Sequence, residues 1–181
     1  SSSGGVIDGG DTDTDITANS GTVVIDAVTG VGDAGAIDTQ IDTLDLDNTT
    51  SGNVDINETD ALDINQLDQD AAAGTVNVDA GGTITVVAAQ SGVTGTAGQV
   101  ELDADGAASS IVVNDEVTTT GGAINILADD DAIFSADGDV TSAGGNVTVS
   151  GDANAGGSGT DGALTMADGA VINAGSGTVD M

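Results

Sequence analysis

Residues 122 to 149 read GAINILADDDAIFSADGDVTSAGGNVTV, and this stretch contains the pattern that decides the fold. It holds two copies of one template, a glycine followed by two aliphatic residues that alternate with other residues. The first copy is GAINI from Gly122 and the second is GNVTV from Gly145. Such alternation predicts a β-strand with one buried face. A further apolar run, AIF at 132–134, lies between the copies.

The template occurs throughout the chain, and the central copies are spaced by 22 to 24 residues. The template fits GTVVI from Gly21, GNVDI from Gly52, GTVNV from Gly74, GQVEL from Gly98, GAINI from Gly122, GNVTV from Gly145, GALTM from Gly162 and GTVDM from Gly177. A second signature, an aliphatic residue followed by a small polar stretch, precedes several of them, as in VTTTGG from Val117 and VTSAGG from Val140. Each period therefore holds about three short strands.

Three short strands per period, joined by Gly and Asp turns, predict an all-β fold, a right-handed parallel β-helix (β-solenoid) of about eight coils of roughly 23 residues. We expect Val76, Val100, Ile124 and Val147 to form one inward column. A β-sandwich is the alternative, but it would not keep a 23-residue register over several periods. Residues 1–181 form one solenoid segment, with loop insertions expected at 28–41 and 151–161, where the spacing stretches.

The stretches GGAINILADDDAIFSADGDVTSAGGNVTVSG and GALTMADGAVINAGSGTVDM resemble the repeat arrays of filamentous-haemagglutinin-like bacterial exoproteins. These are very large secreted or surface-anchored adhesins built as right-handed parallel β-helices. The resemblance implies a structural role in an extracellular stalk or filament, at the cell surface or in a matrix or biofilm. The Asn-rich secretion domain of the family has no counterpart in this sequence, so export by a two-partner route is implied by analogy alone.

The charge of the chain excludes several classes of partner. It has 31 acidic residues and no Lys, Arg or His, which gives a formal charge of −31. Nucleic acid and anionic lipid are poor partners for such a surface, because phosphate binding relies on basic side chains. No apolar run reaches the ~18 residues of a membrane span. We expect no nucleic-acid binding and no direct membrane insertion, which leaves a surface or a glycan as the class of target.

Two short motifs resemble calcium loops but depart from them. GGSGTDGAL at 156–164 nearly matches the calcium-binding nonapeptide of repeat-in-toxin β-rolls, yet its large apolar residue arrives one place late at Leu164 and no neighbouring copy shares an ion. We interpret it as a glycine-rich loop. DTDTD at 11–15 lacks the Gly and Glu of an EF-hand, since Ile16 and Thr22 occupy those positions. We interpret it as an exposed strand with outward Asp residues.

Parallel β-helices also include polysaccharide hydrolases and lyases, so a carbohydrate-active enzyme that uses carboxylates is the alternative function. An inverting hydrolase needs only two carboxyl groups, and the run DDD at 129–131 supplies three. The chain nevertheless has no base to bind uronates and no Trp or Tyr to stack on sugar rings. Threonine pairs such as Thr83 and Thr85 resemble those of ice-binding solenoids but do not recur in every coil. We therefore predict a non-enzymatic protein.

The same register brings acidic residues together. Asp105, Asp129 and Asp152 each come seven residues after a template glycine, which places them at one corner of three successive coils. We predict that this carboxylate column is neutralised by cations, either by a specific metal such as Ca²⁺ or by the salt of a saline habitat. Asp130 and Asp131 are further candidate ligands. We also expect end-to-end association of the rod, or continuation of the same chain, because GTVDM ends inside the template.

Overall fold

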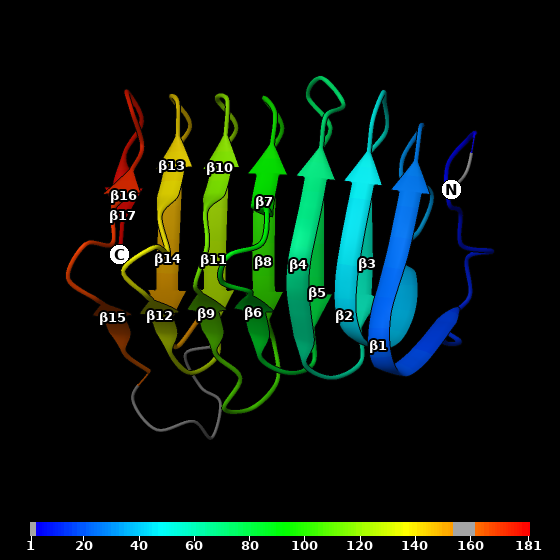
Figure 1. Cartoon of the computed structure of the whole chain (residues 1–181), viewed down its shortest axis with the longest axis horizontal. Coiled ribbons are helices and arrows are strands. Elements are labelled where there is room, and N and C mark those ends of the chain that lie inside the picture. The colour runs from blue at the N-terminus through cyan, green and yellow to red at the C-terminus, as the bar shows by residue number, and fades with distance from the viewer. Residues whose placement is uncertain (1–2, 154–161) are drawn as a thin grey trace.

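The computed structural model describes residues 3–153 and 162–181, and this part of the chain contains seventeen strands, no α-helix and therefore no helix able to cross a membrane. All seventeen strands belong to one sheet, and their pairings are parallel. Successive coils lie side by side along the rod, with the two chain ends at opposite ends of it (Figure 1). The predicted all-β parallel solenoid is confirmed. The strands are β1 Ile16–Ala27, β2 Ile37–Asn48, β3 Val54–Glu58, β4 Leu62–Gln69, β5 Val76–Ala80, β6 Ile84–Val86, β7 Gly92–Gly95, β8 Val100–Ala104, β9 Ile111–Val113, β10 Val117–Thr119, β11 Ile124–Ala128, β12 Ala132–Phe134, β13 Val140–Ser142, β14 Val147–Gly151, β15 Leu164–Met166, β16 Ile172–Asn173 and β17 Val179–Asp180.

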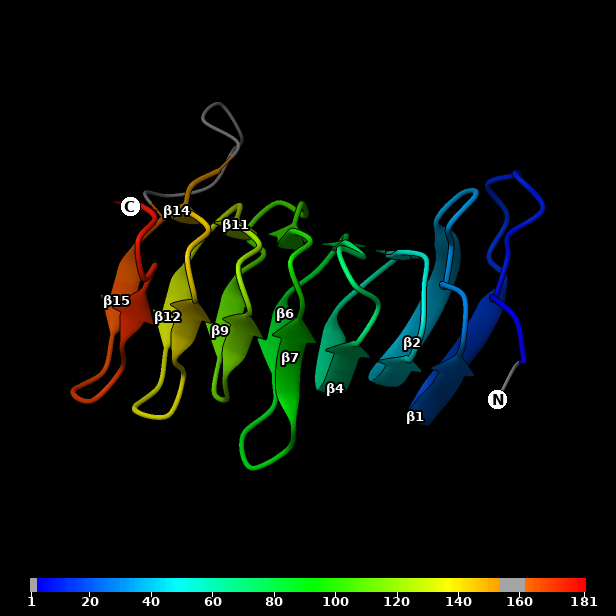
Figure 2. The ribbon, with the colours of Figure 1, turned by 90° about the horizontal axis from the view of Figure 1, so that it is seen from above.

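The strands stack into three walls. The first wall contains β3, β5, β8, β11, β14 and β17; the second contains β6, β9, β12 and β15; and the third contains β7, β10, β13 and β16. Towards the N-terminus the second and third walls merge, because β4 pairs with β6 through its first residues and with β7 through its last ones. The long strands β1 and β2 continue this merged wall, as Figures 1 and 2 show. The first residues of β2, 37–39, pair with β3 and so extend the first wall.

The interior is filled by aliphatic columns that run along the rod. Val76, Val100, Ile124 and Val147 are paired with one another in successive strands, and each is at most 1% exposed. The predicted inward column is therefore confirmed. Phe134, the single aromatic residue of the chain, is buried in the same core. Because each coil contributes only one thin layer, its apolar face is buried by the coils above and below it.

Steric contact between coils explains why the template positions are glycine. Gly74, Gly98, Gly122, Gly145 and Gly177 stack at the corner before the first wall, and a Cβ on any of them would overlap the carbonyl oxygen of the template glycine in the preceding coil. The corner is also held by buried polar side chains. Asn48 donates from Nδ2 to Gln69 Oε1 at 2.8 Å, and the hydroxyls of Thr119 and Ser142 both donate to the Gly122 carbonyl at 2.6 and 2.9 Å.

The predicted number of coils is too high, because the rod has about six turns rather than eight. The template copy from Gly21 lies in β1, where Val23 pairs with Leu44 of the merged wall. The copy from Gly162 leads into β15 of the second wall, where Leu164 pairs with Ala132. Neither copy starts a coil on the first wall. The copies from Gly52, Gly74, Gly98, Gly122, Gly145 and Gly177 all follow the same corner, the one before the first wall.

Residues 28–36 connect β1 to β2, and Val31 among them forms a parallel bridge with Val54, whereas residues 37–41 of the predicted loop insertion belong to β2. The prediction for residues 11–15 is wrong. DTDTD at 11–15 is not a strand: it precedes β1 and contains a turn in which Asp13 N donates to Asp11 Oδ1 at 3.0 Å. A side chain that bonds its own backbone competes with strand pairing. Residues 154–161 lie outside the described residues, and with them most of the predicted insertion at 151–161 and of the 156–164 motif.

Candidate cation sites on the carboxylate ladders

An acidic ladder runs along the outer surface of the merged wall. Asp26 of β1 pairs with Asp47 of β2, and Asp47 pairs with Asp68 of β4. Parallel in-register pairing stacks identical positions about 4.8 Å apart, so the three carboxylates follow one another on successive coils. Asp70, just after β4, adds a fourth. We call Asp47, Asp68 and Asp70 the acidic trio, because carboxylate oxygens from all three lie within 4.8 Å of one another.

The acidic trio is held in an unfavourable electrostatic environment. Burial, together with the charges of Asp70, Asp26 and Asp45, raises the pKa of Asp47. Burial, and then the charges of Asp70 and Asp47, raises the pKa of Asp68. The Oδ1 atoms of Asp47 and Asp68 are buried and accept no hydrogen bond from any described residue. A hard cation would satisfy these oxygens and remove the repulsion.

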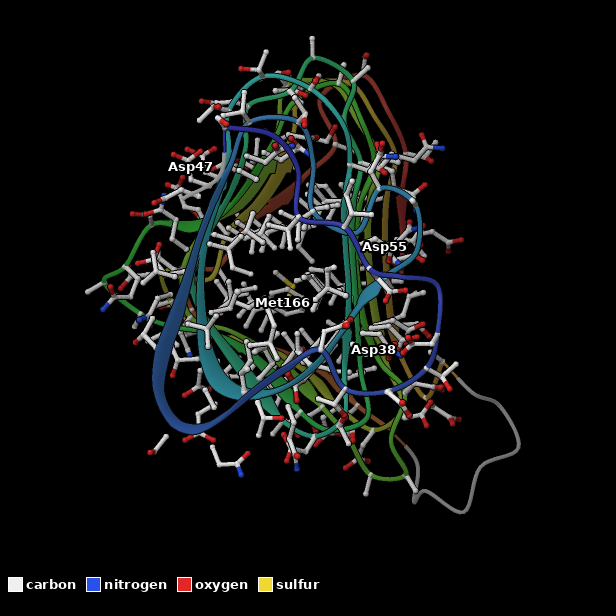
Figure 3. All side chains as sticks on the ribbon, turned by 90° about the vertical axis from the view of Figure 1, so that its right-hand side faces the viewer. Asp38, Asp47, Asp55 and Met166 are labelled. Atoms are coloured by element: carbon white, nitrogen blue, oxygen red, sulfur yellow. The ribbon has the colours of Figure 1, made fainter. Side chains whose placement is uncertain are left out.

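A second acidic ladder lies on the first wall. Asp79 of β5 pairs with Asp103 of β8, and Asp105 and Asp129 follow at the next corner. Burial and the charges of Asp79, Asp105, Glu101 and Asp129 raise the pKa of Asp103 to about 6. The pKa of Asp79 is also raised, by burial and then by Asp105, Asp55 and Glu101. Figure 3 shows Asp38 and Asp55 of the first wall on the opposite side of the rod from Asp47, so the two ladders are separate.

Elsewhere on the first wall, acids are separated by amides. Asn57 donates from Nδ2 to Asp38 Oδ1 at 2.6 Å, Asn77 donates to Asp55 Oδ1 at 3.0 Å, and Asn125 donates to Glu101 Oε2 at 2.7 Å. Each of these acids has an amide neighbour on the adjacent coil. Direct stacking of acid on acid, as at Asp79 and Asp103 or at Asp47 and Asp68, is thus the exception that calls for a proton or a cation.

Asp105, Asp129 and Asp152, the predicted carboxylate column, each directly follow a strand of the first wall. Asp105 and Asp129 follow Ala104 and Ala128, which pair with each other, so these two aspartates do occupy successive coils. Asp152 follows Gly151, the partner of Ala128, but has a positive φ of 66° and donates its backbone N–H to Asp130 O at 3.0 Å. The Oδ1 atom of Asp129 is buried without a hydrogen-bond partner among the described residues.

Asp130 and Asp131 are engaged in backbone contacts. Asp130 N donates to Ser109 O at 2.9 Å, and Asp131 Oδ1 accepts from Ala163 N at 2.8 Å. In residues 3–153 and 162–181, the acidic trio is the one group in which three carboxylates approach closely enough to share an ion. Sequence reasoning missed it, although the aligned segments LDN at 46–48 and LDQ at 67–69 carry the signal. These segments lack a template glycine, which is the residue that makes the other repeats recognisable.

An open groove of about 320 Å³ lies beside the merged wall and is lined by Asp42, Thr43, Ala61 and Asp63. Both carboxylates are exposed. The alternative, carbohydrate-active function would use a groove lined by carboxylates of this kind. Its lining contains neither an aromatic ring to stack on a sugar nor a base to hold an acidic one, so it offers no binding platform beyond the two acids.

A scan against protein-family models, a search of curated proteins and a search of solved structures each found no match to this chain.

Proposed function

We propose that the chain is a structural segment of an extracellular bacterial fibre or adhesin stalk, in which stacked coils act as a stiff spacer at the cell surface. The observation that carries the proposal is the unbroken parallel register of the first wall, from Val54 of β3 to Val179 of β17. Its backbone hydrogen bonds run along the rod, and each coil depends on its neighbours for burial. The resemblance of the repeats to those of large bacterial adhesins supports the same role.

The C-terminal coil supports end-to-end growth of the rod. Leu164 and Met166 are 36% and 38% exposed, whereas Ala132 and Phe134, their partners one coil earlier, are buried. Val179 is 42% exposed, whereas its partner Val147 is buried. Met166 lies inside the ring of coils when the rod is viewed along its axis (Figure 3). We propose that a further coil covers this face, supplied either by continuation of the chain or by a second copy.

Cations are the partners that the charge of the rod requires. With no base in the chain, the stacked carboxylates of the two ladders have no internal counter-charge. Calcium accepts carboxylate oxygens in flexible geometry at 2.3 to 2.6 Å, and the acidic trio offers three carboxylates to one ion. Salt would act more weakly and along the whole surface. We propose that cations neutralise both ladders and thereby stabilise the rod and its end-to-end contacts.

Sedimentation and small-angle scattering of the full chain test the stalk role. We expect elongated particles that lengthen with protein concentration at constant cross-section, and that lengthen more readily in calcium or high salt. The substitution Met166→Asp should abolish the lengthening by placing a charge on the open coil, while Asp13→Asn, which lies near the other end, should not. A wild-type chain that stays a monomer at high concentration in calcium and in high salt would contradict end-to-end growth.

A further inference from the structure

The two ends of the rod differ in how they leave the edge of the sheet. At the C-terminal end, the last coil consists of residues 162–181, which contain β15, β16 and β17, and we call it the open coil. Its inward side chains are exposed, Leu164 by 36%, Met166 by 38% and Val179 by 42%. The open coil carries two acids, Asp168 and Asp180. It therefore presents apolar side chains with little charge.

The backbone of the open coil offers hydrogen-bond donors as well. In the earlier coils, amides of inward residues donate to the coil that follows. Val147 N donates to Thr178 O at 2.8 Å, and Ala132 N donates at 2.9 Å to the carbonyl group that precedes Leu164. Val179 is the paired residue of Val147, and Leu164 is that of Ala132, so the amides of Val179 and Leu164 point away from the rod. Such an edge is a template for pairing with another strand.

At the N-terminal end, by contrast, residues 3–15 lie over the edge of the sheet. Gly4 O accepts from Val28 N at 3.0 Å, and Val6 N donates to Gly30 O at 2.9 Å. Backbone bonds thus hold this segment against the coil that follows it, and we call it the N-terminal cap. The cap lies beyond β1 in Figure 1 and passes across the ring of coils in Figure 3.

The N-terminal cap has features that oppose strand pairing. Asp8 is 8% exposed, and its Oδ2 atom accepts from Gly10 N at 2.7 Å, so a carboxylate is buried at this edge of the core. The register of β1, the strand next to the cap, shifts between Ala18 and Thr22. Inward-pointing charges and breaks in register protect sheet edges from further pairing. The cap contains four acids in all, Asp8, Asp11, Asp13 and Asp15.

We propose that two copies of this chain associate through their open coils, C-terminal end to C-terminal end, while the N-terminal caps leave the other ends free. The proposal rests on the end-to-end association proposed above and narrows it to one contact with a second copy. A two-fold axis across the rod relates the copies, so identical surfaces meet and the facing strands run antiparallel. The first wall of one copy continues into that of the other through β17.

Charge favours this arrangement over head-to-tail stacking. In a head-to-tail contact the apolar side chains of the open coil would cover the cap, whose acids would lose water with no base in the chain to neutralise them. Between two open coils, Leu164, Met166 and Val179 of each copy cover one another. Asp180 alternates with Val179 along β17 and stays on the outer surface. Association therefore stops at two copies.

Sedimentation equilibrium of the full chain in high salt tests the number of copies. We expect the mass to rise with concentration and to level off at twice the 17.1 kDa of one chain. Val179→Asp, which places a carboxylate in the contact, should weaken the dimer at least about tenfold. Val24→Asp makes the same change at an exposed position of β1 and should leave the dimer unchanged. A mass that rises beyond two copies would overturn the C-terminal contact and leave end-to-end association standing, whereas a monomer at every concentration would overturn both.

Distances between spin labels locate the contact in the unmutated interface. The chain has no cysteine, so Asp180→Cys places a label on the outer surface of the open coil and Asp13→Cys places one on the cap. About six coils at about 4.8 Å each give a rod of about 30 Å. In the proposed dimer, the labels at residue 180 lie about 20 Å apart and those at residue 13 about 60 Å apart. Head-to-tail stacking repeats every position after one rod length, so equal distances of about 30 Å for both labels would overturn the proposal.

Discussion

The glycine corner gives the sharpest test of how the coils stack, through the substitution Gly122→Ala. A Cβ at this position would overlap the carbonyl oxygen of Gly98 and lie 3.1 Å from the carbonyl oxygen of Ala97. These are backbone atoms, so the clash cannot be relieved by rotating a side chain. The two coils must separate locally, and the adjacent ladder bond, from Val100 N to Ala123 O at 2.9 Å, must lengthen.

The expected cost follows from the contacts of Gly122. Its carbonyl accepts two buried hydroxyl donors, from Thr119 and Ser142. Weakening these bonds at about 1 kcal/mol each, and straining the ladder by a similar amount, gives a loss of about 3 kcal/mol in the free energy of unfolding. For a chain of this size, that loss lowers the melting temperature by about 6 to 12 °C.

Gly121→Ala is the matched control, because a Cβ at the neighbouring Gly121 meets nothing within 4 Å. We expect it to leave the stability unchanged or to raise it by up to about 1 kcal/mol, since alanine restricts the unfolded chain. Urea titrations of both variants at fixed ionic strength measure the difference. If the two variants unfold within about 0.5 kcal/mol of each other, the close stacking of template glycines is wrong.

Further predictions concern charge and register. Every pKa shift that the structure resolves is upward, at Asp47, Glu58, Asp68, Asp79 and Asp103. The folded chain therefore binds more protons than the unfolded chain, and the free energy of unfolding should rise as the pH falls from about 6 to 3.8. Chemical denaturation at several pH values checks this, and a steady loss of stability over that range would refute it. Asp103→Asn should raise the stability at pH 7 by about 1 kcal/mol after allowance for solvent screening, and Asp13→Asn, with the same change in net charge, should have little effect. Cysteines replacing the paired Thr94 and Thr118 should form a disulfide on mild oxidation, because their Cα atoms lie one coil apart, whereas cysteines replacing Thr94 and Thr141, two coils or about 10 Å apart, should not; equal cross-linking of both pairs would contradict the register.

The sequence predicts the solenoid well because one physical feature repeats. The corner glycines, the alternating aliphatic residues and the constant period all arise from stacking identical coils, so Val76, Val100, Ile124 and Val147 could be assigned to one column without coordinates. The N-terminal part was predicted less well for the same reason. There β1, β2 and β4 run straight through the position at which later coils turn. Glycines therefore no longer mark the period in this part of the sequence.

The candidate sites also differ in whether the sequence predicts them. The positions of Asp105 and Asp129 follow from counting residues after a glycine, and the strand register agrees with that count. The acidic trio does not follow, because Asp47 and Asp68 are aligned by the long strands β2 and β4 rather than by a glycine, and Asp70 approaches them only through the turn after β4.

The central claim is that cations stabilise this rod by neutralising stacked carboxylates, and a thermal melt in calcium at matched ionic strength tests it most directly. With a dissociation constant typical of extracellular calcium modules, about 10 mM calcium should add about 1.5 to 2.5 kcal/mol to the stability of the wild type relative to the same chain in a chelator. Asp68→Asn, which removes one carboxylate of the acidic trio, should lose most of that response. Asp129→Asn should reveal any share held by the second ladder, and Asp13→Asn should keep the response in full. If the melting temperature follows ionic strength alone and none of these substitutions changes the response to calcium, specific cation binding by the carboxylate ladders is wrong.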